Sequence, residues 1–280
     1  MGVLLAALSA LLYGSADFAG GVAARRSPAL SVVAVSQIFG ILLALIAAPI
    51  VGPNGAGARD FAWGAAAGLA GALGLVTLYR GIASGLATVV SPVAALLGAA
   101  VPLMFGIASG EKPHLAAWIG VSLCLPAVAL VTFERGGRRG TAAFRSSGYG
   151  IASGISFGIF FICISRPSAA AGLWPLVAAR ATSITALAVT ASLSGKEPFR
   201  IERGMAIVVM AGVFDMAANV AYILSTRLAL FALATVVASL YPAPTVVLGA
   251  LIFRERLGAV RVVGLICALA GAVLISAGSS

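Results

Sequence analysis

The sequence predicts an all-α membrane protein with ten transmembrane helices, arranged as two inverted five-helix repeats. Three observations carry this prediction: the composition, the length of the apolar segments, and a similarity between the two halves of the chain. Hydrophobic residues make up 61% of the 280 residues and charged residues only 9%, and the mean hydropathy is +1.11. A chain this apolar cannot face water over most of its length, so we expect an integral, multi-pass membrane protein.

The apolar segments are continuous and long enough to cross a hydrocarbon core, which takes about 20 helical residues. Barrel strands would be about ten residues long and would alternate polar with apolar positions, so helices are favoured. Almost nothing is left for a soluble domain. The expected spans are 3–23, 30–50, 62–80, 86–108, 115–133, 148–165, 172–194, 204–225, 231–253 and 258–276.

The basic residues at the ends of these spans set the orientation. Counted from the amino end, the odd gaps hold thirteen lysines and arginines and the even gaps four. The positive-inside rule then places the odd gaps in the cytoplasm and both termini together on the outer side, in a bacterial inner (plasma) membrane. Because topology explains the net charge of +10, nucleic acid is not an expected partner.

The two halves of the chain resemble each other. LATVVSPVAALLGA around Thr88 is similar to LATVVASLYPAPTVVLGA around Thr235, and SGEKP at Glu111 is similar to FRERL at Glu255. Because each unit has an odd number of helices, five, the second unit must enter the membrane in the opposite sense to the first. The two units are then related by a pseudo-two-fold axis that lies in the membrane plane. The expected units are a first repeat at 1–133, a polar linker at 134–147 and a second repeat at 148–280.

The segment LYPAPTVVLGALIFRERLGAVRVVGLICALAGAVLI resembles the EamA-type drug/metabolite transporter superfamily. YGSADF, from Tyr13 to Phe18, and GEKP at Glu111 resemble the first-half motifs of that family. The resemblance implies a cavity lined mainly by helices 1, 3, 4, 6, 8 and 9, and alternating access, but no particular substrate. The family often has an arginine in the second helix of each repeat, where this chain has Gln37 and Arg180.

The first helix carries a polar face. Ser9, Tyr13 and Asp17 are four residues apart and therefore lie on one side of the helix. This span lacks the basic start of a signal peptide and carries an acid within its apolar stretch, so we expect it to be retained. Asp17 is a candidate for binding substrate or protons, or alternatively a hydrated residue at the cavity mouth that pairs with Arg25 or Arg26.

Helices 7 and 8 carry the other two charges inside apolar spans. Asp215, Asn219 and Tyr222 form a polar stripe on one face of helix 8. A carboxylate in hydrocarbon is costly, so Asp215 is expected to face a cavity or find a partner. Arg180 stays charged and requires a carboxylate, carbonyl groups or an anionic substrate nearby, and the favoured interpretation is a pair with Asp215 or Asp17.

Two acids and one arginine leave one carboxyl uncompensated if all three meet. A carboxyl without a basic partner can take up a proton, so this constellation suggests proton coupling. A purely structural role, in which the three groups hold helices together, is the alternative. The predicted substrate- or proton-binding residues are Asp215, Asp17, Arg180, Asn219, Tyr222 and Tyr13.

Prolines are expected to interrupt helices 4 and 9 at corresponding places, with Pro92 and Pro102 in one and Pro242 and Pro244 in the other. Each proline frees a carbonyl group and permits a bend, and paired broken helices indicate the binding site or its gates in inverted-repeat transporters. A structural kink is the alternative. The predicted gating or cavity-lining residues are Pro92, Pro102, Thr88, Thr235, Ser239, Tyr241 and Pro242, with Ser91 beside them.

The remaining features have structural interpretations. The abundant glycines are expected to allow close helix packing, and Glu111 is expected to form an ion pair at a helix end or a gate latch. Cys124, Cys163 and Cys267 lie inside apolar spans without metal-binding spacing, so no disulfide, metal site or cofactor is predicted.

The expected function is secondary active transport. We predict proton-coupled export of a small polar or amphipathic metabolite, amino acid-like or drug-like, by a protein for which a monomer is sufficient. An intramembrane aspartyl-type enzyme or a non-transporting scaffold is the alternative, although His114, the one histidine, lies between helices and no catalytic motif is present. Convergence of Asp17, Arg180 and Asp215 on one cavity would favour transport.

Overall fold

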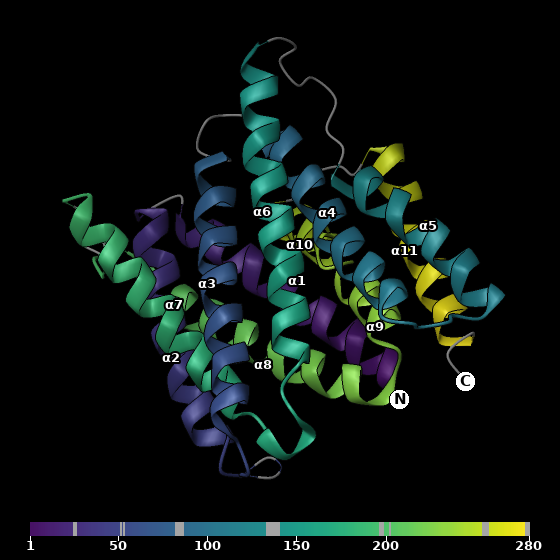
Figure 1. Ribbon diagram of the computed structural model, residues 1–280. Coiled ribbons are helices and arrows are strands. Elements are labelled where there is room, and N and C mark those ends of the chain that lie inside the picture. Colours follow the sequence, from purple (N-terminus) through teal and green to yellow (C-terminus); the bar gives the residue numbers. More distant parts are fainter. Residues whose placement is uncertain are drawn as a thin grey trace.

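The computed structural model describes residues 1–24, 27–50, 52, 54–81, 87–132, 141–195, 199–201, 203–253 and 258–277 (Figure 1). Within these residues the secondary structure is entirely helical. The helices are α1 (Gly2–Ala24), α2 (Ala29–Ala47), α3 (Ala58–Gly81), α4 (Ala87–Ala108), α5 (Leu115–Thr132), α6 (Thr141–Ser165), the short 3-10 helix η2 (Ala169–Ala171), α7 (Trp174–Leu193), α8 (Met205–Leu228), α9 (Phe231–Ala238), α10 (Pro242–Phe253) and α11 (Ala259–Ala277).

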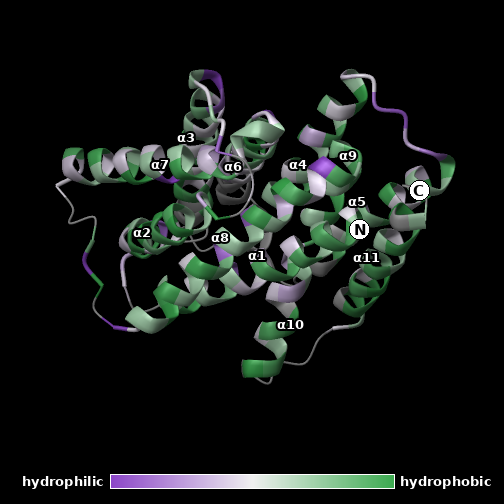
Figure 2. Ribbon diagram, turned by 90° about the horizontal axis from the view of Figure 1, so that it is seen from below, coloured by the Kyte–Doolittle hydropathy of each residue, from purple (hydrophilic) through white to green (hydrophobic). Residues whose placement is uncertain are grey.

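The lengths of these helices confirm the predicted membrane fold. Seven segments of the described chain are long and apolar enough to cross a membrane, with α9 and α10 together forming one of them, and three further helices carry shorter apolar stretches. Large apolar side chains such as Leu4, Leu115 and Leu269 are exposed on the outside of the bundle. Figure 2 shows hydrophobic residues over most of the helices, as expected for contact with lipid.

The helices of the two repeats are interleaved. The main contacts of α1 are with α8, those of α3 with α6 and α7, those of α4 with α6, and those of α5 with α11. Figures 1 and 2 show α2, α3 and α7 on one side of the molecule and α4, α5 and α11 on the other, with α1 and α6 between them. Neither repeat therefore has a core of its own.

Glycines allow the backbones to approach each other across this interface. A Cβ atom at Gly154 would lie 2.6 Å from the Cβ atom of Leu97, and one at Gly158 would lie 2.6 Å from that of Val101. Contacts this close leave no room for a side chain at either glycine, so the backbone of α6 lies directly against α4. The predicted packing role of the glycines is confirmed at these positions.

The ninth predicted helix is broken, whereas the fourth is not. α9 ends at Ala238 and α10 begins at Pro242, but α4 runs without interruption through Pro92 and Pro102. The prediction of matching breaks was therefore wrong for helix 4. A proline removes one hydrogen bond, which a membrane helix can tolerate by a local adjustment, whereas Pro242 stands at a helix start, where no such bond is lost.

α6 begins earlier than predicted, at Thr141 in place of residue 148. Figure 1 shows this helix extending beyond its neighbours. Residues 133–140, the first part of the predicted linker, lie outside the described residues. The division of the chain into two repeats and a linker stays a prediction.

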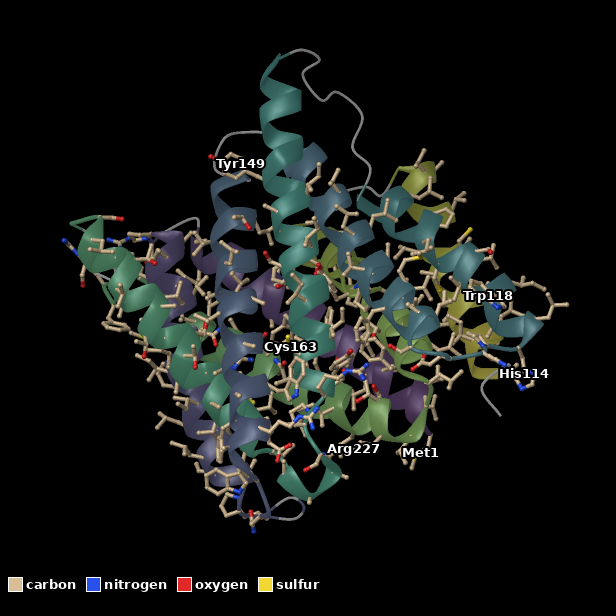
Figure 3. All side chains as sticks on the ribbon, viewed as in Figure 1. Met1, His114, Trp118, Tyr149, Cys163 and Arg227 are labelled. Atoms are coloured by element: carbon tan, nitrogen blue, oxygen red, sulfur yellow. The ribbon has the colours of Figure 1, made fainter. Side chains whose placement is uncertain are left out.

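The even-numbered gaps between the predicted spans lie at one end of the bundle, the even-gap end, where the connecting loops contact each other. The Asp60 carboxylate accepts hydrogen bonds from the backbone N–H of Ser168 at 2.7 Å and of Gly57 at 2.9 Å, and Trp174 Nε1 donates to Asn54 Oδ1 at 2.8 Å. Arg227, labelled near this end in Figure 3, donates to the Gly172 carbonyl oxygen at 3.0 Å. These contacts join the α2–α3 connection to the α6–α7 connection.

Glu111 also acts at this end. Its carboxylate accepts hydrogen bonds from the backbone N–H groups of Phe231 at 2.9 Å and Ala232 at 2.8 Å, which caps the first turn of α9. Arg166 lies over the rings of Phe105 and Phe231, at 4.6 and 5.6 Å from their centroids. For Glu111 the sequence predicted an ion pair at a helix end or a gate latch. In the structure Glu111 instead caps α9, a helix of the opposite repeat. The similar Glu255 lies outside the described residues.

Candidate functional site

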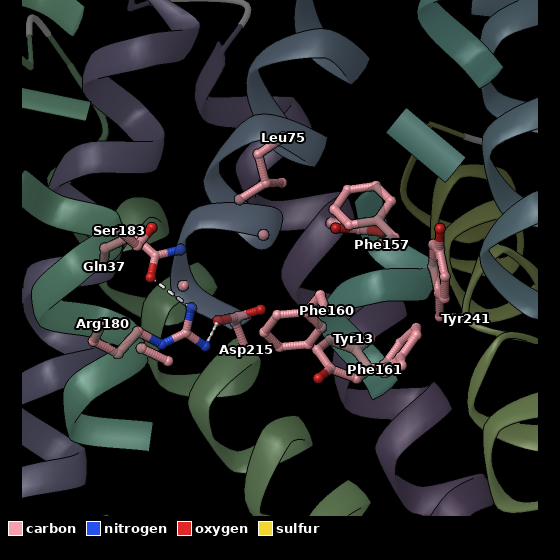
Figure 4. A pocket seen from close by; sticks show the side chains of 14 residues that line it. Tyr13, Gln37, Leu75, Phe157, Phe160, Phe161, Arg180, Ser183, Asp215 and Tyr241 are labelled. Atoms are coloured by element: carbon pink, nitrogen blue, oxygen red, sulfur yellow. Dashed lines mark hydrogen bonds and ion pairs between the residues drawn. The ribbon is translucent and has the colours of Figure 1, made fainter. Parts of the chain in front are cut away.

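A cavity with about 650 Å³ of empty space, part of which is open to solvent, lies between helices of both repeats (Figure 4). It contains all three of the charged residues that the sequence placed deep in apolar spans. Helices α1, α2 and α3 contribute from the first repeat, and α6, α7, α8 and the α9–α10 break contribute from the second. The lining residues are Tyr13, Asp17, Gln37, Gly68, Gly71, Leu75, Phe157, Phe160, Phe161, Ala179, Arg180, Ser183, Asp215 and Tyr241.

Arg180 and Asp215 form an ion pair at one side of the cavity. Arg180 Nη2 donates to Asp215 Oδ2, and Nη1 donates to Gln37 Oε1 at 2.5 Å. The Arg180 side chain is 8% exposed and that of Asp215 is 32% exposed, so the carboxylate faces open space while the guanidinium is enclosed. Of the two partners considered for Arg180, the structure selects Asp215.

Gln37 was noted in the sequence only as a departure from the arginine common in the family. In the structure it holds the arginine of the other repeat, across the interface between α2 and α7. Gly40, one turn further along α2, lies beside the same side chain, since a Cβ atom there would be in van der Waals contact with Arg180 Nε at 3.4 Å. The corresponding second helices of the two repeats therefore meet through these side chains.

Asp17 and Tyr13 line the cavity from α1. Asp17 is partly buried, and within the described part of the chain it has neither a hydrogen bond nor an ion pair. Its predicted partners Arg25 and Arg26 lie outside the described residues. Tyr13 is 9% exposed, and its hydroxyl group is buried without a hydrogen-bond partner. Ser9, predicted on the same face, donates to the carbonyl oxygen of Ala218 at 2.9 Å and joins α1 to α8.

The polar stripe of α8 divides between the cavity and the packed interior. Asp215 lines the cavity, whereas Asn219 and Tyr222 are absent from its lining. The Asn219 amide donates to the backbone carbonyl of Asp215 at 2.7 Å, and its own oxygen is buried without a partner. The Tyr222 hydroxyl group lies 2.7 Å from Thr235 Oγ1 and donates to the Phe161 carbonyl oxygen at 3.3 Å. Tyr222 thus connects α8 with α6 and α9.

The predicted gating residues have different surroundings. Tyr241 lines the cavity at the break between α9 and α10, and Pro242 is buried at the start of α10. Ser239 has a buried hydroxyl group without a partner. Pro102 is buried within α4. The side chains of Thr88, Ser91 and Pro92 lie outside the described residues.

Sequence reasoning missed the aromatic wall of the cavity. Phe157, Phe160 and Phe161 of α6 line one side, and Figure 4 shows them with Tyr13 and Tyr241, opposite the Arg180 end of the cavity. Their spacing of three and four residues places them on one face of a helix. That pattern was visible in the sequence, but an aromatic face on a membrane helix can equally face lipid.

The arrangement offers one compensated charge pair, one acid that has no partner among the described residues, and several aromatic rings in a single cavity. The ring centroids of Tyr13 and Phe161 are 6.0 Å apart and those of Tyr13 and Tyr241 6.4 Å, in edge-to-face geometry. No group of His, Cys, Asp and Glu side chains suited to a metal ion occurs among the described residues.

Comparisons with known proteins identify a family and a fold for this chain. The profile of the EamA-like transporter family matches residues 1–133 and again 146–277. A search of curated proteins finds no match. A solved structure described only as "Crystal structure of protein" superposes with a TM-score of 0.74, covering 98% of this chain and 95% of that one at 15% identity. At that identity the likeness concerns the fold alone.

Proposed function

Because the chain belongs to the EamA-like transporter family, we propose that it is a secondary active transporter that exports a small polar or amphipathic metabolite, driven by protons. The observation that carries this proposal is the convergence of Asp17, Arg180 and Asp215 on one cavity between the repeats. Ionisable groups inside a membrane are costly and typically mark a substrate or proton pathway.

The ion pair fixes the charge balance of the cavity. Arg180 is held by Gln37 and Asp215, so its positive charge is compensated within the protein. Asp17 has no such partner among the described residues, which makes it the carboxyl group best suited to bind and release a proton. Asp215 contributes by keeping the arginine in place and by presenting an exposed carboxylate oxygen to the cavity.

Alternating access requires parts of the bundle to move around the cavity. The break between α9 and α10 lies beside the site, since Tyr241 of this break lines the cavity. Discontinuous helices next to the binding site are a recurring device of inverted-repeat transporters. The contacts of Asp60, Glu111 and Arg227 at the even-gap end support a state in which that end is closed.

An intramembrane aspartyl-type enzyme is less well supported. Such an enzyme needs two carboxyl groups that share a proton around one water molecule. Asp215 is instead paired with an arginine, and that pairing is the geometry of a fixed counter-charge. Asp17 and Asp215 therefore have unequal surroundings, which suits a transporter with one proton-binding group.

The test uses the purified full-length protein in proteoliposomes with an imposed pH gradient. We expect a labelled mixture of amino acids and amphipathic amines to yield at least one compound whose accumulation depends on the gradient, and Asp17→Asn to abolish that accumulation. Glu197→Gln, which removes a carboxylate in the connection between α7 and α8, serves as the control for charge and handling. Accumulation that persists after the pH gradient is collapsed would contradict proton coupling.

A further inference from the structure

We infer that the compound carried in this cavity is an organic cation with an apolar or aromatic body, whose charged nitrogen binds beside Asp17. This inference rests on the proposed transport function and adds the chemical class of the substrate. It follows from three observations: the charge left over in the cavity, the aromatic wall, and the unsatisfied hydroxyl group of Tyr13.

The described side chains that line the cavity carry a net negative charge. Asp17 and Asp215 are acidic, and Arg180 is the one basic residue among the described lining residues. Arg180 is already bound to Asp215 and to Gln37, so it cannot also neutralise Asp17. A ligand that brings one positive charge completes the balance, whereas an anion would add to the repulsion.

The ion pair also disfavours anionic and zwitterionic ligands. A ligand carboxylate would need a free cationic group in the wall of the cavity. The guanidinium of Arg180 is enclosed, with 8% of its side chain exposed, and both of its terminal nitrogens donate hydrogen bonds to protein groups. A carboxylate that bound there would share one guanidinium with Asp215, so the site would hold two negative charges against one positive charge.

The aromatic wall suits a cation with an apolar body. Tyr13, Tyr241, Phe157, Phe160 and Phe161 contribute five rings to the lining. The face of an aromatic ring attracts a cation within about 6 Å by roughly 0.5–2 kcal/mol, and the same rings pack against an apolar body. Figure 4 shows the rings gathered opposite Arg180, with Asp215 between the two regions.

Tyr13 provides the observation that points to a ligand. Tyr13 lines the cavity with only 9% of the residue exposed, and its buried hydroxyl group has no hydrogen-bond partner among the described residues. A buried hydroxyl group without a partner costs free energy unless something fills the space beside it. Because Asp17 follows Tyr13 by one helical turn on α1, a ligand at this place would meet both groups.

The experiment compares two ions of the same shape and opposite charge. Binding of tetraphenylphosphonium and of tetraphenylborate to the full-length protein in detergent is measured by calorimetry, with detergent alone as the blank. We expect tetraphenylphosphonium to bind at least about tenfold more tightly than tetraphenylborate, which corresponds to about 1.4 kcal/mol. Equal affinity for the two ions, or tighter binding of the anion, would overturn the inference.

Variants then locate the site. Asp17→Asn is expected to weaken tetraphenylphosphonium binding at least about tenfold, while Asp17→Glu, which keeps the charge, retains most of it. Tyr13→Leu is expected to weaken binding by about 2- to 30-fold through loss of the ring. Glu197→Gln, with the same change of charge in the connection between α7 and α8, should bind like the unmodified protein. Unchanged binding in folded Asp17→Asn protein would refute the assignment, and if that variant does not fold, the comparison of the two ions in the unmodified protein decides.

The transport measurement separates this inference from the proposed function. Proton-driven accumulation of neutral amino acids, without binding of the phosphonium ion, would leave the proposed function intact and overturn the inference that the substrate is an organic cation. Binding of the phosphonium ion at Asp17, without any flux that depends on the pH gradient, would leave the cation site intact and overturn proton-coupled transport.

Discussion

The fourth helix of the first repeat and its counterpart in the second start from similar sequences and end in different structures. α4 is continuous from Ala87 to Ala108, whereas α9 and α10 are separated at residues 239–241. In the first copy, Thr88 and Gly98 are ten positions apart, and in the second, Thr235 and Gly249 are fourteen apart. The additional residues, about one helical turn, coincide with the break.

This difference is one of several between the two repeats, which supply different groups to the cavity. The second repeat supplies the broken helix, with Tyr241 in the cavity lining, and also both members of the ion pair, Arg180 and Asp215. The first repeat supplies Asp17, a carboxyl group without a partner among the described residues, and Gln37, the amide that orients the arginine. Symmetry of fold therefore coexists with asymmetry of chemistry.

The largest loss of stability is expected on replacing Arg180, the residue of the second repeat that contacts Gln37. Arg180→Ala leaves the Asp215 carboxylate in the bundle without its counter-charge, and we expect the protein to lose about 3–5 kcal/mol of stability. Gln37→Ala, in the first repeat, removes one hydrogen bond to a charged group and should cost about 1.5–3 kcal/mol. Thermal unfolding in detergent measures both losses.

A double variant checks the physical reason for this ranking. Arg180→Met combined with Asp215→Asn removes both charges, so it should be more stable than Arg180→Met alone, which has the same packing at position 180 but leaves Asp215 unpaired. If the double variant is not the more stable of the two, the loss on replacing Arg180 reflects packing of the arginine side chain rather than an unpaired charge.

The contact between α1 and the helix break gives the next largest effect. A Cβ atom at Gly14 would lie 2.8 Å from the Cβ atom of Pro244 and closer still to the Tyr241 carbonyl oxygen. Gly14→Ala is therefore expected to destabilise the protein by about 1–3 kcal/mol through overpacking. Gly21→Ala on the same helix meets nothing within 4 Å and serves as the control. Equal thermal stability of the two variants would show that the break adapts freely to α1.

The cap that the first repeat provides for the broken helix should have a smaller effect. Glu111→Ala removes the acceptor of two backbone N–H groups at the start of α9, and loss of a helix cap costs about 0.5–2 kcal/mol. Hydrogen exchange of the amides of Phe231 and Ala232 should increase in this variant. The exposed neighbour Lys112→Ala should leave that exchange unchanged, and faster exchange there in both variants would contradict a specific cap.

The smallest effect is expected at the hydrogen bond that holds α9 to α8. Tyr222→Phe removes the hydroxyl group that meets Thr235 at 2.7 Å, with an expected loss of about 1 kcal/mol in unfolding free energy. Because Tyr222 lies outside the cavity lining, binding of the phosphonium ion should be unaffected. Weakened binding in this variant would mean that the α8–α9 contact controls the cavity. Tyr149→Phe, at an exposed position, is the control.

Much of the fold could be predicted from the sequence because membrane helices are specified by apolar length and by charges at their ends. The pairing of Arg180 with an acid was predictable on similar grounds, since a buried arginine needs a counter-charge. The early start of α6 was not predictable, because the polar residues from Thr141 read as a linker. The continuity of α4 was missed because proline content alone does not determine whether a helix breaks.

The lining of the cavity was harder to predict than its charges. Tyr222 and Asp215 lie on one face of α8 by helical spacing, yet only Asp215 reaches the cavity, because α9 covers Tyr222 through Thr235. Phe157 and Phe160 carry no sequence signal that distinguishes cavity from lipid. In both cases the decisive fact is how a helix is rotated against its neighbours, which depends on the whole bundle.

The interleaving of the two repeats has a consequence for synthesis of the chain. The main partners of α1, α3 and α5 are α8, α6 with α7, and α11, all of which leave the ribosome later. Gln37 precedes Arg180 by 143 residues, an interval of roughly 7–30 s at ordinary rates of translation. During that wait the early helices must be kept apart from unsuitable neighbours, and this task falls to the insertion machinery and the surrounding lipid.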